Sequence, residues 1–267
     1  MASANECEMP KTAHIPETTK ENDPMLDVHP PHGSTHTWKD FFIHIATICV
    51  GLLIAIGLEQ TVEAIHHHHQ REYLEEQMHE ESERNLKLIE EQIVYATKSK
   101  QYLEQCEQAL ESAPVNAGAV TVTLPVDHTT GPASGILISP SRGTWTVAKA
   151  AGTVALLPPE TAKIYARLDL AAEFEQISEE RGTPALHNLE SMQRSTRVLG
   201  RAGSPVQMTV NQRDQLLHAF DQYQRATDDF IFRLAILRGA VQAVLGNIHE
   251  LDEMYAYQQH AVKELAP

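Results

Sequence analysis

The pattern of apolar and polar positions is dominated by one uninterrupted apolar run at residues 41–58. The run has eighteen residues and no formal charge, and as a helix it is roughly 27 Å long, close to the hydrocarbon thickness of a bilayer. Trp38 and Lys39 precede it, which suits an aromatic and cationic anchor at a membrane interface. The run predicts one transmembrane helix over residues 38–60; the alternative is a buried core helix of a soluble protein.

The residues after the run predict a long juxtamembrane helix over 61–112. Residues 59–112 contain no glycine or proline and are rich in good helix formers. Late in this segment a stripe with steps of three and four residues appears, which is typical of a helix that packs on another helix. The stripe consists of Leu86, Ile89, Ile93, Ala96, Lys100, Leu103, Glu107 and Leu110. Because one helix from Trp38 to this point would be about 110 Å long, we expect a break or bend near the four histidines at 66–69.

Residues 113–144 change character and predict either a small β-hairpin or an irregular loop. Val120, Val122 and Leu124 alternate with polar residues, and Ile136 and Ile138 alternate later. Both interpretations stay open, because two isolated strands are only marginally stable.

Residues 145–267 predict a helical bundle that packs against the stripe at 86–110. One helix ends before Gly152, a second begins near Pro159, and residues 181–184 separate it from a third. The last helix carries an apolar seam over about six heptads. The seam consists of Leu216, Phe220, Tyr223, Thr227, Phe230, Leu234, Leu237, Val241, Val244, Ile248, Leu251, Tyr255, Gln258 and Val262. Since other helices must cover such a seam, the expected fold class is all-α: a transmembrane helix, a helical stalk and an extramembrane bundle.

Composition and charge narrow the classes of partner. The 267 residues carry a formal net charge of −15, which argues against nucleic acid, because phosphate contacts need clustered lysine and arginine. Cys7 lies in the tail, Cys49 within the apolar run and Cys106 beyond it, so the sequence predicts no disulfide framework if the two ends face opposite sides of the membrane. Residues 1–37 are polar and lack apolar periodicity, so they predict a disordered tail.

Basic residues near the span predict its orientation. Lys11, Lys20 and Lys39 precede it, whereas only Arg71 lies within about 20 residues after it. This count favours an amino end in the cytoplasm and a carboxyl domain outside it. The run begins too far from the first residue, and lacks the cleavage site, for a signal peptide that is removed.

Histidines after the span are the candidate metal ligands. In a helix His66 and His69 share a face, and the pairs Glu63 with His66 and Glu76 with His79 have Glu-x-x-His spacing. That spacing occurs in di-iron bundles, where the pairs come from facing helices. The candidate set for a divalent transition metal is His66, His69 and His79, and the alternative is a solvated helix face.

A row of small residues predicts association within the membrane. His44, Thr47, Gly51 and Ala55 lie on one helix face, and Val62, Ile65 and His69 extend it. Small residues let two helix backbones approach closely in lipid. The face predicts a parallel homodimer; the alternative is that it only contacts lipid.

Catalytic motifs are absent from the sequence. It contains no G-x-S-x-G, no phosphate-binding G-x-x-x-x-G-K-[ST], no H-E-x-x-H and no C-x-x-C. We therefore expect no catalytic residue and, apart from the metal ion considered above, no cofactor.

Two segments resemble a group of bacterial single-pass membrane proteins of uncharacterised function. The first reads W-K-D-F-F-I-H at 38–44 and G-L-L-I-A-I-G-L-E at 51–59, and the second reads W-x-x-A-K-x-x-G-x-x-A-L-L-P at 145–158. The resemblance covers about fifty residues of the chain. It implies a bacterial inner-membrane protein with a periplasmic helical domain, and it implies no activity.

These features predict a structural or interaction module of the bacterial envelope without catalytic activity. Its expected partners are the lipid bilayer, a second copy and a protein of unknown identity. The alternatives are a ligand-sensing bundle and a metal-binding protein. A deep polar pocket would distinguish a sensor from a scaffold: a sensor should have one in the bundle, lined by the seam around Tyr223, Thr227 and Phe230, whereas a scaffold should have none.

Overall fold

One continuous helix opens the part of the chain that the computed structural model describes, which comprises residues 38–126, 139–198 and 201–265. Helix α1, Trp38–Glu111, has 74 residues. The predicted break near the four histidines is wrong, because the helix runs through them. The predicted tail 1–37 and the pair Ile136 and Ile138 lie outside the described residues.

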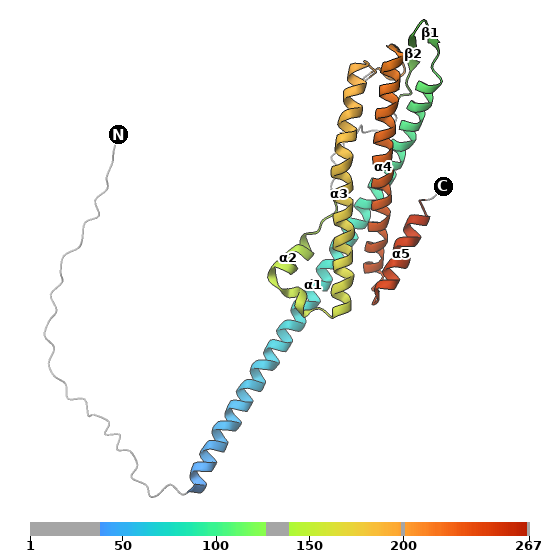
Figure 1. Ribbon diagram of the computed structural model, residues 1–267. Helices are drawn as coiled ribbons and strands as arrows, with labels where there is room; N and C mark the ends of the chain where they lie inside the picture. Colours follow the sequence, from blue (N-terminus) through green and yellow to red (C-terminus); the bar gives the residue numbers. More distant parts are fainter. Residues whose placement is uncertain (1–37, 127–138, 199–200, 266–267) are drawn as a thin grey trace, which may run out of the picture. The chain divides into compact units, whose positions relative to one another are not determined.

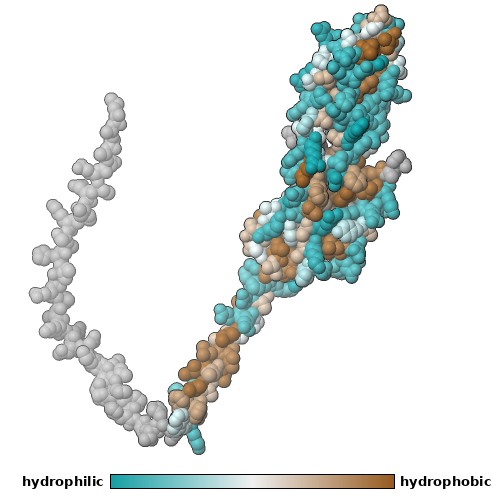
Figure 2. Space-filling model, viewed as in Figure 1, coloured by the Kyte–Doolittle hydropathy of each residue, from teal (hydrophilic) through white to brown (hydrophobic). Residues whose placement is uncertain are grey.

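The chain divides into two compact units at Gly57 and Leu58. In the first unit, every described residue is exposed, and Figure 2 shows apolar side chains at the surface along the first part of α1. The apolar window of α1 is long and apolar enough to cross a membrane. The exposure favours a lipid-facing span over the core helix of a soluble protein, whose apolar residues would be buried.

The second unit is a helical bundle with one small sheet, so the fold class is all-α as predicted. The later helices are α2 (Gly143–Ala151), the short 3-10 helix η1 (Thr153–Leu156), α3 (Pro159–Ser195), α4 (Val210–Leu245) and α5 (Leu251–Lys263). Helices α3 and α4 lie side by side next to the later part of α1, and α5 lies along α4 (Figure 1).

The sheet consists of β1 (Val115–Asn116), β2 (Ala119–Thr123) and β3 (Pro205–Thr209) in the order β1-β2-β3. Strands β1 and β2 form a hairpin, in whose turn Ala117 and Gly118 adopt positive φ. Its first strand, β1, was not predicted, and the second alternating segment of the predicted hairpin, at Ile136 and Ile138, lies outside the described residues. Strand β3 was not predicted. It pairs antiparallel with β2, placing Val206 opposite Val122 and Met208 opposite Val120, and this third strand stabilises an otherwise marginal hairpin.

The predicted interruption at residues 181–184 is wrong, because α3 continues through Pro184. Proline removes one backbone donor from a helix, but this stretch is held by its neighbour. A Cβ added at Gly182 would lie 3.7 Å from the Cβ of Ala226, so α3 and α4 approach closely there. Tertiary packing therefore overrides the local helix-breaking signal.

The predicted single last helix is also wrong, because it is two antiparallel helices. Helix α4 ends at Leu245, and Asn247 adopts a left-handed φ of 52°, a conformation that asparagine tolerates. Helix α5 then packs on α4 at Gly239, where an added Cβ would lie only 2.5 Å from the Cα of Gln258. Gly239 is thus a close contact between helices, although the sequence pattern placed it away from the seam.

Two separate apolar cores hold the bundle together. The α2 core joins Ile89, Ile93 and Ala96 of α1 to α2, to the first half of α3 and to the end of α4 beginning at Phe230. The sheet core joins the last part of α1 from Leu103 to the strands and to the first part of α4 up to Phe220. The predicted stripe on α1 and the first part of the seam therefore face each other.

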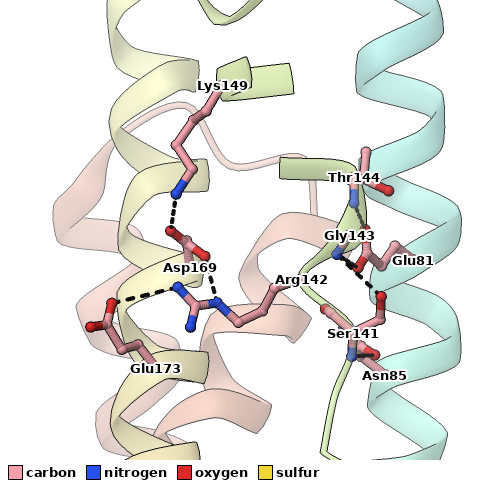
Figure 3. A network of polar contacts seen from close by, with 9 residues as sticks. All are labelled: Glu81, Asn85, Ser141, Arg142, Gly143, Thr144, Lys149, Asp169 and Glu173. Atoms are coloured by element: carbon pink, nitrogen blue, oxygen red, sulfur yellow. Dashed lines mark hydrogen bonds and ion pairs between the residues drawn. The ribbon is translucent and has the colours of Figure 1, made fainter. Parts of the chain in front are cut away.

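A polar network attaches α2 to its neighbours (Figure 3). The carboxylate of Glu81 on α1 accepts hydrogen bonds from the backbone N–H groups of Gly143 and Thr144, both at 2.9 Å. These donors at the start of α2 have no partner within the helix, and a negative charge there is favourable. Burial alone would raise the pKa of Glu81, but bonds from Ser141, Thr144 and Gly143 hold it below its ordinary value. Arg142, which follows Ser141, forms an ion pair with Asp169 of α3 at 2.7 Å.

We predict that Phe230→Ala and Leu237→Ala each lower the free energy of unfolding by about 2–5 kcal/mol, because both side chains leave a cavity. Phe230 is 7% and Leu237 is 1% exposed. Phe232, at 44% exposure, is the control, and its alanine variant should lose less than about 1 kcal/mol. Chemical denaturation of the full chain in a mild detergent measures all three. Equal losses at Phe230 and Phe232 would contradict the packing described above.

Candidate ligand pocket

A pocket of about 240 Å³ lies between the two cores, where α1, α3 and α4 meet. Three of its lining residues, Tyr223, Thr227 and Phe230, are those at which a sensor pocket was expected. The remaining lining residues are Tyr95, Ala96 and Ser99 on α1, Ser178, Glu179, Gly182, Thr183 and Leu186 on α3, and Ala226 on α4. Hydroxyl, carboxylate and aromatic groups therefore replace aliphatic packing at this level.

Small side chains form part of the lining. Ala96 and Ser99 on α1, Gly182 on α3 and Ala226 on α4 have little or no side chain beyond Cβ, and they line the pocket from three directions. Protein interiors are otherwise close-packed. The gap is therefore a local interruption of the close packing seen in the two cores on either side of it.

Glu175 is the most unusual side chain near the pocket. It lies on α3 one turn before Ser178 and Glu179, is 1% exposed, and neither carboxylate oxygen has a hydrogen-bond partner within the described residues. Burial, and then the charge of Glu179, raise the pKa of Glu175 from 4.5 to about 7. A buried carboxylate without a partner is costly, so Glu175 takes up a proton near neutral pH.

The other polar groups at this level are paired locally. Ser178 donates to the carboxylate of Asp229 at 2.5 Å, and Arg233 also binds Asp229, at 3.4 Å. Lys100 forms an ion pair with Asp228 at 2.7 Å. Two cations beside the pocket are thus occupied by aspartates of α4.

Glu179 has a weaker partner. Its carboxylate accepts a hydrogen bond from the Ser139 hydroxyl at 2.9 Å, and no ion pair is recorded for it among the described residues. The pocket consequently contains a carboxylate whose charge the surrounding side chains do not neutralise.

Sequence reasoning did not identify Tyr95, Ser99, Ser178, Glu179 or Glu175. A signal was present for Glu175, because it falls on the same helical face as the buried apolar residues Ile164, Leu168 and Ala171. A glutamate on an otherwise apolar face indicates either a paired charge or a functional group. On α1, the polar interruption of the stripe at Lys100 marks the level of the pocket.

The structure does not bring the candidate metal ligands together. His66 and His69 are exposed and His79 is partly exposed. His66 contacts Gln70 at 2.9 Å, His69 contacts Glu72 at 3.6 Å and His79 contacts Glu83 at 3.7 Å. Within the described ranges no group of three or more suitable side chains could hold a metal ion. The metal site stays a hypothesis, which zinc retention by the purified protein would test.

The candidate association face lies in the first unit. His44, Thr47, Gly51 and Ala55 are all exposed on α1. The Thr47 hydroxyl donates to the carbonyl oxygen of Ile43 at 2.8 Å, so it needs no partner from another helix. A Cβ at Gly51 would meet no described atom within 4 Å, which leaves this face open.

Comparisons with known proteins found no matching family model, no matching curated protein and no matching solved structure. The pocket is therefore interpreted from its own geometry.

We predict that the free energy of unfolding of the wild type increases as the pH falls from about 8 to about 5. In the folded state the pKa of Glu175 is about 7, whereas in the unfolded state it returns to its ordinary value of 4.5. Between these two pH values the folded state therefore binds one more proton than the unfolded state. The stabilisation is present below the ordinary pKa and is lost as the pH rises through about 7. Its size is roughly 3 kcal/mol at about 1.4 kcal/mol per pKa unit.

Glu175→Gln should remove this contribution and should be more stable than the wild type at pH 8. The matched control is Glu180→Gln, because Glu180 is exposed on the same helix. Denaturation curves at several pH values, followed by circular dichroism, measure the difference between the variants. If Glu175→Gln and Glu180→Gln have the same pH dependence, Glu175 is not a buried titrating group.

Proposed function

We propose that this protein is a membrane-anchored ligand-sensing module, with the pocket between α1, α3 and α4 as its binding site. The observation that carries the proposal is the pocket itself, lined at Tyr223, Thr227 and Phe230 as the sensor alternative requires. A purely structural bundle has no need of a gap between its two apolar cores in which a few polar groups interrupt a mainly apolar lining. The pocket therefore favours ligand sensing over the scaffold interpretation.

The arrangement of polar groups supports a ligand-binding site rather than a packing defect. Ligand pockets are mostly apolar, with a few convergent polar groups that fix orientation. Here aromatic rings from α1 and α4 face hydroxyl and carboxylate groups from α3. A ligand held by three helices would alter how they pack, which gives the bundle a means of signalling. The proposal assigns no catalytic step.

We predict that small fragments bind this pocket and that Ala226→Trp prevents their binding, because the indole ring fills the space. Gln215→Trp is the control, since Gln215 is exposed on the same helix. Fluorine NMR of the full chain in nanodiscs, titrated with a fluorinated fragment library, measures binding. Fragments that bind all three proteins equally would refute the pocket as the site, as would the absence of any fragment hit.

A second proposal concerns association through the membrane span. The face formed by His44, Thr47, Gly51 and Ala55 is open, and the apolar side chains of Val62 and Ile65 continue it beyond the apolar run with exposures of 66% and 52%. Apolar residues outside the lipid are better explained by a second helix than by water. We propose a parallel homodimer through this face.

We predict that Gly51→Ile lowers the dimer fraction severalfold, because a branched side chain separates the two backbones. Gly57→Ile is the matched control: it makes the same change in the same helix but off the association face. Crosslinking in the native membrane measures the dimer fraction. An unchanged fraction in Gly51→Ile would mean that the face contacts lipid.

The proposed location is the bacterial inner membrane, with the amino end in the cytoplasm and the bundle in the periplasm. The lysines before the span and the resemblance to bacterial single-pass proteins support this orientation. A reporter fused after Pro267 that is active only in the cytoplasm would reverse it.

A further inference from the structure

The charges around the pocket point to the sign of its ligand. Its lining contains one charged residue, Glu179, and no lysine, arginine or histidine among the described residues that form it. Glu175 lies one helical turn away and is fully buried without a partner. Lys100 and Arg233, two cations near the pocket, are bound by Asp228 and Asp229. The pocket therefore has an excess of negative charge, which repels anions.

The aromatic side chains point to the chemical form of the ligand. Tyr95 of α1 and Tyr223 and Phe230 of α4 contribute aromatic rings to one small space. The faces of such rings attract cations, and most strongly where water is excluded. Burial, and then the nearby Tyr95, raise the pKa of Tyr223, so this phenol stays neutral and the wall adds no further charge.

The size of the pocket limits the ligand. Its volume of about 240 Å³ equals the space of roughly eight water molecules at about 30 Å³ each. A small molecule fits within it, whereas most of a long polyamine or a peptide would lie outside it. A bare metal ion is disfavoured, because no suitable group of three or more ligating side chains occurs in the described part of the chain.

We propose that the pocket binds a small organic ammonium ion with an apolar body, the ammonium group lying toward Glu179 and the apolar body against the aromatic rings. This inference rests on the ligand-binding function proposed above. In this arrangement the ammonium group of the ligand is the ionic partner of Glu179.

Binding should also affect the protonation of Glu175. A cation near this carboxyl group favours its ionised form, so binding near pH 7 releases a proton and becomes tighter as the pH rises. Other groups contribute to the local field, and they are Tyr95 and Lys100 on α1, Glu179 on α3, and Tyr223, Asp228, Asp229 and Arg233 on α4. Burial raises the pKa of Glu175 to about 7, so this group titrates within the pH range of the binding experiment.

Three probes of matched shape test the sign of the ligand: 2-phenylethylammonium, neutral 2-phenylethanol and anionic 3-phenylpropionate. Isothermal titration calorimetry of the full chain in zwitterionic nanodiscs at pH 7.5 measures their affinities. We expect the ammonium ion to bind at least tenfold more tightly than the alcohol, and the carboxylate to show no binding. Equal affinities for the ammonium ion and the alcohol would overturn the proposal.

Two variants locate the interaction. Glu179→Gln should weaken binding of the ammonium ion at least tenfold without changing that of the alcohol. Glu180→Gln, one residue further on and exposed, should leave both unchanged. Circular dichroism verifies that the variants are folded. If Glu179→Gln and Glu180→Gln behave alike, the ammonium group does not lie beside Glu179.

The pH dependence tests the role of Glu175. Affinity of the wild type for 2-phenylethylammonium should fall severalfold from pH 8 to pH 6, whereas Glu175→Gln should show little change over this range. A wild type without pH dependence would overturn the coupling to Glu175. Fragments that bind through the pocket but show no preference for cations would refute the ammonium proposal alone; loss of every pocket-dependent hit would refute the ligand-binding function as well.

Discussion

The bundle depends on the packing of three long helices, because the facing sides of α1, α3 and α4 must be buried against one another at every level along the bundle. Above and below the pocket this is done by aliphatic and aromatic packing in the α2 core and the sheet core. Between them each of the three helices contributes at least one small and one polar residue beside larger aromatic or aliphatic side chains. A polar group on one helix can be buried only where the facing helices offer a partner or space, so the polar positions must coincide. Because these positions coincide, the three helices leave a gap, and its lining contains hydroxyl and carboxylate groups.

Where α2 is attached to α1, two buried polar side chains of α1 have hydrogen-bond partners. Glu81 and Asn85 of α1 are buried, yet each meets backbone groups: Glu81 accepts from Gly143 and Thr144, and Asn85 both donates to and accepts from Ser141 at 2.8 Å. Charge-assisted bonds of this kind are strong and directional. The network fixes α2 on the face of α1 and α3 without involving the pocket (Figure 3). Buried polar groups with partners thus position an element, whereas Glu175, without one, is available for another role.

The sequence predicted the periodic features and missed those set by tertiary contacts. The stripe from Leu86 to Leu110 and the buried seam at Phe230 and Leu237 were read correctly, because helix packing imposes its period directly on the sequence. The turn after Leu245 was missed because the apolar period of α5 continues that of α4 by coincidence, although the chain reverses at Asn247. Strand β3 is short and gains its stability from β2 rather than from its own pattern. The pocket could be anticipated at Tyr223, Thr227 and Phe230, but the contributions of Ser178 and Glu179 required knowledge of which face of α3 meets α4.

Burying the carboxyl group of Glu175 without a hydrogen-bond partner among the described residues lowers the free energy of unfolding of the bundle. Replacing an unpaired buried carboxylate by an apolar or neutral group normally stabilises a protein, so its presence lowers the stability of the unliganded bundle near neutral pH. Local conflicts between burial and polarity of this kind are typical of functional sites. Protonation relieves the conflict at low pH, and a bound cation would relieve it at higher pH. Under the proposed binding of a cation, occupation of the pocket favours the ionised form of Glu175, whereas the empty pocket near neutral pH favours the protonated form. The same carboxyl group that destabilises the empty bundle would then make the packing of α1, α3 and α4 respond to a ligand.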